Sequence, residues 1–235
     1  MASELMAQQH SMVHRALGTK IVLTVYGDEY FPLLSQAMKM IDGYEDRLTV
    51  NRPVSEVMAV NQAAGRTPKL VSPTTYELVK LAVHYSRENF GFNALIGPLV
   101  KLWKIGFAGA NVPSDQAIKD RLRLIDPYQV LLDDDNRTVY LEQPGMELDL
   151  GGIAKGYIAD RVRDFWLAQG VPAGIINLGG NLVFVGQSPR RADGQWIIGV
   201  QDPQLKRGHD LETVRQPACS AVTSGIYERF LVKDG

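Results

Sequence analysis

The segment from residue 147 to residue 170 constrains the fold more than any other part of the sequence. Glu147–Leu150 predicts a short strand, which the pair Gly151-Gly152 interrupts. Residues 154–169 then predict a helix, and Gly170 follows it as a residue typical of C-terminal caps. The apolar side chains of this helix that we expect to face the core are Ile158, Val162, Phe165 and Trp166. A strand that leads into a helix through a glycine pair excludes an all-α or an all-β fold.

Short strands are predicted elsewhere by alternation and turn signals. Residues 19–26 (TKIVLTVY) alternate apolar and polar side chains and are rich in β-branched residues. Residues 128–132 and 138–141 predict a hairpin around the acidic turn 133–136, whose carboxylates we expect to be solvated rather than to bind a cation. Further short strands are expected at residues 175–176, 182–185 and 195–201.

Helical spacing of apolar residues indicates further helices. Residues 30–48 predict an amphipathic helix. Ser72-Pro73 is a typical helix start, with a buried stripe expected at Leu78, Leu81, Ala82 and Tyr85. Ser55 is expected to cap a short helix in which Glu56 and Asn61 have structural roles. Together these elements predict an α+β fold with mixed or antiparallel sheets and packed helices.

Composition excludes several classes of protein. The 235 residues carry 25 Lys and Arg against 26 Asp and Glu, so the formal charge of −1 argues against a dedicated nucleic-acid-binding protein. Cys219 is the only cysteine, which rules out an intramolecular disulfide and a multi-thiolate zinc site. We expect a flexible N-terminus over residues 1–12 and one domain over residues 13–235.

Targeting signals are absent from the sequence as given. The N-terminus lacks the basic start and apolar run of a secretory signal, and no run approaches the ~18 apolar residues of a membrane span. We therefore expect a cytoplasmic protein without a membrane span, or an exported lipoprotein if a leader precedes this sequence.

The strongest local motif is DLGGIAKGYIAD at residues 149–160. Glycines allow a ligand close to the backbone, a helix start offers free N–H groups, and Lys155 adds a positive charge. The segment is therefore either a pyrophosphate cradle or a tight strand-to-helix turn with an exposed lysine. Two other glycine-containing segments, at residues 176–186 and 221–230, each read either as part of a ligand site or as an ordinary turn.

Seven blocks, in this order, resemble the FAD:protein FMN transferases, also called the ApbE family. They are ALGT (16–19), RPVSEVMAVN (52–61), GFNALIGPLVKLW (91–103), MELDLGGIAKGYIAD (146–160), IINLGGN (175–181), WIIGVQDP (196–203) and VTSGIYER (222–229). The resemblance implies an ApbE-like flavin transferase fold, binding of FAD and Mg²⁺, and transfer of FMN to a Ser or Thr hydroxyl of a target flavoprotein with release of AMP. The alternatives are an FAD pyrophosphatase that yields FMN and AMP, and a non-catalytic FAD-binding protein.

The resemblance also implies site residues, none of which it identifies as catalytic. Gly152 matches a position whose backbone region helps to hold the metal. The positions implied to bind FAD are Leu17, Asn51, Gly91, Phe92, Asn93, Asp149, Lys155, Thr223 and Ser224.

Some positions depart from the family pattern. Asn51 stands where an aromatic residue commonly stacks on the isoalloxazine ring, which predicts weaker retention of FAD. Asn93 and Leu95 stand where Asp and Thr are common. Family members continue after the TSG block with a His-rich segment and an Asp-containing loop that supplies metal ligands. If the protein lacks the segment that follows Gly235 in the family, we expect weak metal binding and little or no transfer.

Overall fold

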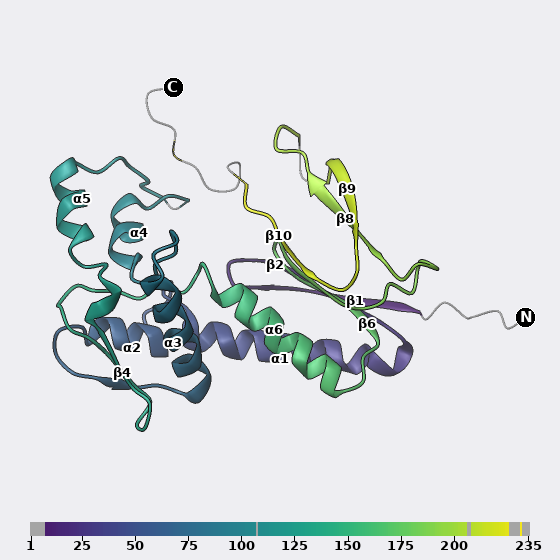
Figure 1. Ribbon diagram of the computed structural model, residues 1–235, viewed down its shortest axis with the longest axis horizontal. Coiled ribbons are helices and arrows are strands. Elements are labelled where there is room, and N and C mark those ends of the chain that lie inside the picture. The colour runs from purple at the N-terminus through teal and green to yellow at the C-terminus, as the bar shows by residue number, and fades with distance from the viewer. Residues whose placement is uncertain (1–7, 107, 206–207, 226–230, 232–235) are drawn as a thin grey trace, which may run out of the picture. The chain divides into compact units, whose positions relative to one another are not determined.

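The computed structural model describes residues 8–106, 108–205, 208–225 and 231, which fold into helices and antiparallel sheets (Figure 1). The chain divides into two compact units. The first comprises residues 1–45 and 155–227, and the second comprises residues 46–154 and 228–235. The α+β class predicted from the sequence is confirmed.

The first unit is built on a five-stranded antiparallel sheet of order β1-β2-β6-β7-β10. Its strands are β1 (Gln9–Ala16), β2 (Thr19–Tyr26), β6 (Ala173–Leu178), β7 (Asn181–Gly186) and β10 (Ser220–Val222). A separate hairpin pairs β8 (Trp196–Gln201) with β9 (Asp210–Gln216). The helices are η1 (Asp28–Tyr30), α1 (Phe31–Leu48), which ends in the second unit, and α6 (Ala154–Ala168).

Both faces of this sheet are covered. Successive side chains of its central strands point to opposite faces, and most of them are buried. Figure 1 shows α1 and α6 along one face, where Trp166 of α6 lies against Gly174 of β6. On the other face, Tyr26 and Phe184 form a cluster with Trp196 of the β8–β9 hairpin. A two-stranded hairpin is marginal by itself in water, so this apolar cluster stabilises it.

The second unit is mainly helical. Its helices are α2 (Glu56–Gln62), α3 (Pro73–Arg87), α4 (Gly97–Trp103), α5 (Asp115–Leu122) and η2 (Pro127–Gln129). A three-stranded sheet of order β3-β5-β4 contains β3 (Lys69–Leu70), β4 (Val130–Asp133) and β5 (Thr138–Leu141). As predicted, Ser55 caps α2, because its Oγ accepts a hydrogen bond of 2.9 Å from Met58 N.

The acidic turn between β4 and β5 is held by its own side chains. Asp133 Oδ1 accepts hydrogen bonds from the N–H groups of Asp135 and Asn136, each at 3.0 Å. Asp134 is paired with Lys80 Nζ at 2.6 Å and accepts from the Tyr76 hydroxyl. Burial and the bond to Asp134 raise the pKa of Tyr76 to about 12.

Some local predictions are wrong. Residues 9–12, expected in the flexible N-terminus, belong to β1 because they pair with residues 23–26 of β2. Tyr85, expected in the buried stripe of α3, is 43% exposed. The predicted helix start at Ser72-Pro73 is confirmed: Ser72 is the N-cap residue of α3, although its Oγ makes no capping bond and instead donates to Glu56 Oε2 at 2.8 Å.

The predicted strand at residues 147–150 is also absent. Its backbone groups bond to partners other than a neighbouring strand, namely the Asn61 side chain at Leu148 and the Ala94 carbonyl at Asp149. Among the residues that the structure describes, no helix combines the length and apolar character needed to cross a membrane.

Candidate functional site

In the first unit, the sheet brings two hairpin turns to the same end. The β1–β2 turn contains Leu17 and Gly18, with φ angles of 54° and 69°, and the β6–β7 turn contains Gly179 and Gly180, with φ angles of 70° and 95°. Such left-handed pairs match the twist of antiparallel strands. Because Ile21 pairs with Leu178, the two turns are neighbours.

A third segment reaches this end of the sheet from β10. Val222 pairs with Asn181, and the next residue, Thr223, donates its N–H to the Gly180 carbonyl at 3.1 Å. The side chains of Thr223 and Ser224 are exposed. The structure therefore brings the predicted positions Leu17, Thr223 and Ser224 to one end of one sheet.

Asn177 shapes the β6–β7 turn, although sequence reasoning did not single it out. Its Oδ1 accepts hydrogen bonds from the N–H groups of Gly179 at 3.1 Å and Gly180 at 3.2 Å. Asparagine commonly bonds to the backbone two residues ahead in this way. An asparagine placed two residues before a glycine pair is the signal that identifies it.

In the second unit, the segments containing Gly91–Asn93 and Asp149–Gly152 contact each other. The Asp149 N–H donates to the Ala94 carbonyl at 2.8 Å. A Cβ added to Gly152 would lie 3.1 Å from Cε2 of Phe92, so the glycine allows the ring to approach the backbone. Five predicted positions from distant parts of the sequence, Gly91, Phe92, Asn93, Asp149 and Gly152, are thus brought together.

The glycine loop itself is an exposed turn. Asp149 Oδ1 accepts a hydrogen bond from Gly151 N at 2.8 Å, and Gly151 and Gly152 are both exposed. The loop precedes α6. Lys155 lies in the first turn of this helix, and its side chain is half-buried. The boundary between the units lies between Ala154 and Lys155, so Lys155 belongs to the first unit.

Asn93 uses its side-chain amide within the protein. Its Nδ2 donates to the Ile125 carbonyl at 2.8 Å, and its Oδ1 accepts from Leu95 N at 2.8 Å. An aspartate would keep the second bond but not donate the first. The amide therefore fixes the shape of the loop after Phe92.

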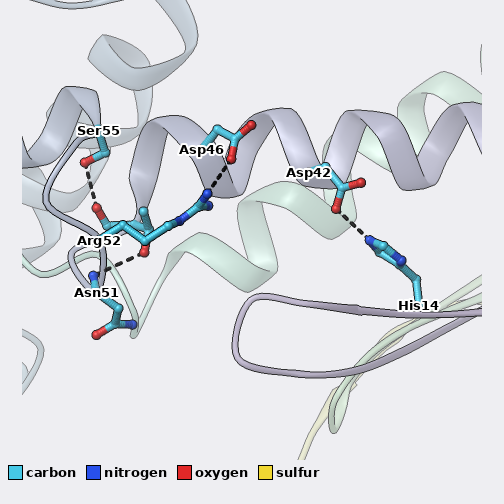
Figure 2. A network of polar contacts seen from close by, with 7 residues as sticks. His14, Asp42, Asp46, Asn51, Arg52 and Ser55 are labelled. Atoms are coloured by element: carbon cyan, nitrogen blue, oxygen red, sulfur yellow. Dashed lines mark hydrogen bonds and ion pairs between the residues drawn. The ribbon is translucent and has the colours of Figure 1, made fainter.

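Asn51 lies in an exposed loop between α1 and α2 (Figure 2). Its N–H donates to Thr49 Oγ1 at 3.2 Å, and the loop is held by an ion pair of 2.8 Å between Arg52 and Asp46. Ser55 Oγ donates to the Thr49 carbonyl at 2.6 Å. The hydrogen bonds described for this loop do not connect Asn51 to the other predicted positions.

The metal position expected at Gly152 has no cluster of metal-ligating side chains around it among the described residues. Within the ranges that the structure describes, no group of three or more His, Cys, Asp or Glu side chains is placed to hold a metal ion. Glu147, close to the glycine loop, is paired with Lys101 at 2.6 Å.

Comparison with known proteins identifies relatives along nearly the whole chain. The profile of the ApbE family matches residues 17–235. An FAD:protein FMN transferase of Klebsiella pneumoniae (strain 342) is 45% identical over 220 residues, which cover 93% of this chain and 67% of that protein. Another, of Treponema pallidum (strain Nichols), is 34% identical over 244 residues and has coverages of 97% and 67%. The chain thus spans 67% of the length of these relatives.

Solved structures show the same fold. The ApbE protein from Thermotoga maritima superimposes with a TM-score of 0.86 at 30% identity, covering 97% of this chain and 74% of that one. The flavin transferase ApbE from Vibrio cholerae gives a TM-score of 0.78 at 24% identity, with coverages of 97% and 75%.

Proposed function

Because the chain belongs to the ApbE family, we propose that it transfers the FMN part of FAD to a Ser or Thr hydroxyl of an acceptor flavoprotein. The hydroxyl oxygen attacks the phosphorus of the FMN half and forms a phosphoester. The bond between that phosphorus and the bridging oxygen breaks, AMP leaves with the bridging oxygen, and the hydroxyl proton passes to a base. Two curated relatives more than 30% identical to this chain carry the name of this activity.

The observation that carries the proposal is the exposed glycine loop beside Phe92. Gly151 and Gly152 are exposed, the N–H of Gly151 donates to Asp149 Oδ1, and α6 begins two residues after Gly152. Backbone N–H groups at such a position suit a pyrophosphate, because they donate hydrogen bonds and the helix dipole is positive there. We assign Asp149 and Gly152 to this part of the FAD site, and Lys155 to charge neutralisation.

The remaining positions are assigned to FAD by the same proposal. Leu17 would contact the flavin end, and Thr223 and Ser224 would lie near the pyrophosphate. Gly91, Phe92 and Asn93 would line the nucleotide, where the amide of Asn93 acts by shaping the loop. Asn51 would lie beside the isoalloxazine ring without stacking on it.

Magnesium belongs to the proposal as a companion of the bound nucleotide. Mg²⁺ commonly keeps several waters and binds through one or two carboxylates plus substrate phosphates. Since the described side chains form no ligand cluster, we expect weak Mg²⁺ binding by the chain without FAD. Calorimetric titrations of Mg²⁺ into the chain, with and without FAD, measure this directly, and tight binding without FAD would contradict it.

The decisive experiment for the activity is mass spectrometry on a mixture of the chain, FAD, Mg²⁺ and a candidate acceptor. Transfer predicts AMP release together with an acceptor that gains FMN at a Ser or Thr. AMP and free FMN without modified acceptor would instead identify an FAD pyrophosphatase. FAD binding without AMP would identify a non-catalytic binding protein.

The charge assignment is tested by Lys155→Ala, with Lys39→Ala as its control. Lys39 is an exposed lysine on α1 that the proposal does not use. Loss of the Lys155 charge is expected to weaken FAD binding about 10-fold, which corresponds to one charge-assisted hydrogen bond. Equal affinities of the two variants for FAD would remove Lys155 from the site.

A further inference from the structure

Asn61 makes an unusual pair of long-range contacts for a helical side chain. It lies on α2 and is 9% exposed. Its Nδ2 donates to the Leu148 carbonyl at 2.9 Å, and its Oδ1 accepts from Leu148 N at 2.8 Å. One side-chain amide thus satisfies both backbone groups of a residue 87 positions away in the sequence.

This pair of bonds replaces a neighbouring strand. In an antiparallel sheet, the two residues of a hydrogen-bonded pair exchange two N–H···O bonds, one donated by each residue. Asn61 offers Leu148 the same two partners, because a primary amide carries a donor and an acceptor side by side. Both backbone groups of Leu148 therefore have a hydrogen-bond partner at a place where no strand pairs with it.

The residues that follow Leu148 form the glycine loop. Asp149 N–H bonds to the Ala94 carbonyl at 2.8 Å, and the Asp149 carboxylate accepts from Gly151 N at 2.8 Å. Rotation of the Leu148 peptide groups would move both of these bonds. The direction of the Asp149 carboxylate and the course of the Gly151-Gly152 backbone thus depend on how Leu148 is held.

We propose that Asn61 is a positioning residue for FAD binding, which fixes Leu148 so that Asp149 and Gly152 present their polar groups to the nucleotide. This role rests on the proposed function. A residue that only stabilises the second unit would change its unfolding free energy but leave the affinity of the folded protein for FAD unchanged. A positioning residue changes that affinity.

The test uses Asn61→Asp, whose side chain has nearly the same shape. Its carboxylate can accept from Leu148 N but cannot donate to the Leu148 carbonyl, whereas its protonated form can do both. We expect the Kd for FAD to rise about 10-fold relative to the unmodified chain at pH 8. At pH 5 it should return to within about threefold, because burial favours the protonated acid. The unmodified chain is titrated at both pH values as the reference.

The matched control is Val79→Ala, which removes buried apolar atoms from α3 in the same unit. It is expected to lower stability while leaving the Kd for FAD within about twofold. If Asn61→Asp does not fold, Asn61→Ala removes both amide groups without adding a charge. Circular dichroism before each titration confirms that the chain is folded. Asn61 variants that lose stability but bind FAD as tightly as the Val79→Ala control would refute the proposal.

A readout without ligand separates this inference from the proposed function. Hydrogen exchange of the Asp149 and Gly151 amides should accelerate at least 10-fold in Asn61→Ala but not in Val79→Ala. If the unmodified chain fails to bind FAD, the proposed function fails, yet accelerated exchange would still support the control of this loop by Asn61. Unchanged exchange of both amides would overturn that control whatever the ligand.

Discussion

Replacement of Gly179 by alanine tests how closely the two turns of the first unit are packed. Gly179 has a φ of +70°, and a Cβ at this position would lie 2.2 Å from Thr19 Oγ1, 2.5 Å from its Cγ2 and 2.7 Å from its Cβ. A different side-chain rotamer of Thr19 moves the first two atoms but leaves its Cβ in place. The β1–β2 turn must therefore shift away from the β6–β7 turn.

Two costs determine the size of the effect. A non-glycine residue in the left-handed region costs about 1–2 kcal/mol. Overpacking that forces a backbone shift typically costs about 1–3 kcal/mol. We expect Gly179→Ala to lower the free energy of unfolding by about 2–5 kcal/mol, which is a large fraction of the ~5–15 kcal/mol typical of a folded domain.

Urea denaturation followed by circular dichroism measures this loss, and Gly180→Ala is the control. Gly180 also has a positive φ of +95°, but a Cβ there would meet nothing closer than Thr223 Oγ1 at 3.4 Å. The control should therefore show only the backbone cost of about 1–2 kcal/mol.

A double-mutant cycle isolates the contact itself. Thr19→Gly removes all three clashing atoms, so it should recover about 1–3 kcal/mol of the loss in the Gly179→Ala background. Equal stabilities of the two alanine variants, or no coupling between positions 19 and 179, would refute the close approach of the turns.

Three other substitutions have expected outcomes. Leu17→Asn should stabilise the chain by about 1 kcal/mol in thermal unfolding, because φ is 54° at Leu17 and Asn-Gly suits such a turn. The same substitution should weaken FAD binding. Unchanged FAD binding would remove Leu17 from the site. Gly156→Ala should raise the free energy of unfolding by about 0.5–1 kcal/mol, because alanine favours the helix more than glycine does and nothing lies within 4 Å of the new Cβ. A loss of stability would show that the space around position 156 is not open. Hydrogen bonds from Arg191 and from the Gln195 N–H lower the pKa of Asp193 from 3.8 to about 2, so these contacts stabilise the folded state above pH 3.8 and this contribution disappears as the pH falls toward 2. Asp193→Asn should therefore be less stable than the unmodified chain at pH 5 and equal to it near pH 2 in denaturation curves, and a difference that does not vary with pH would contradict the pairing.

Side-chain patterns within short stretches of the sequence account for several of the local elements. Helical spacing placed α1 and α6 within one residue of their observed ends, and alternation placed β2 at its observed bounds. These patterns are legible because each depends on side chains a few residues apart. The seven sequence blocks, DLGGIAKG and NLGG among them, likewise indicate the ApbE family, whose profile matches residues 17–235.

Tertiary structure alone decided how those elements meet. β1, β9 and β10 were not predicted, since β1 has exposed side chains on one face, β9 is almost wholly exposed, and β10 is three residues long. The predicted strand at residues 147–150 failed because its backbone bonds to Asn61, 87 residues from Leu148, and to Ala94. Local pattern cannot specify which distant group satisfies a backbone donor. The glycine pairs at 151–152 and 179–180 can be recognised in the sequence. Only the folded chain places Gly179 against Thr19 and Gly152 against Phe92.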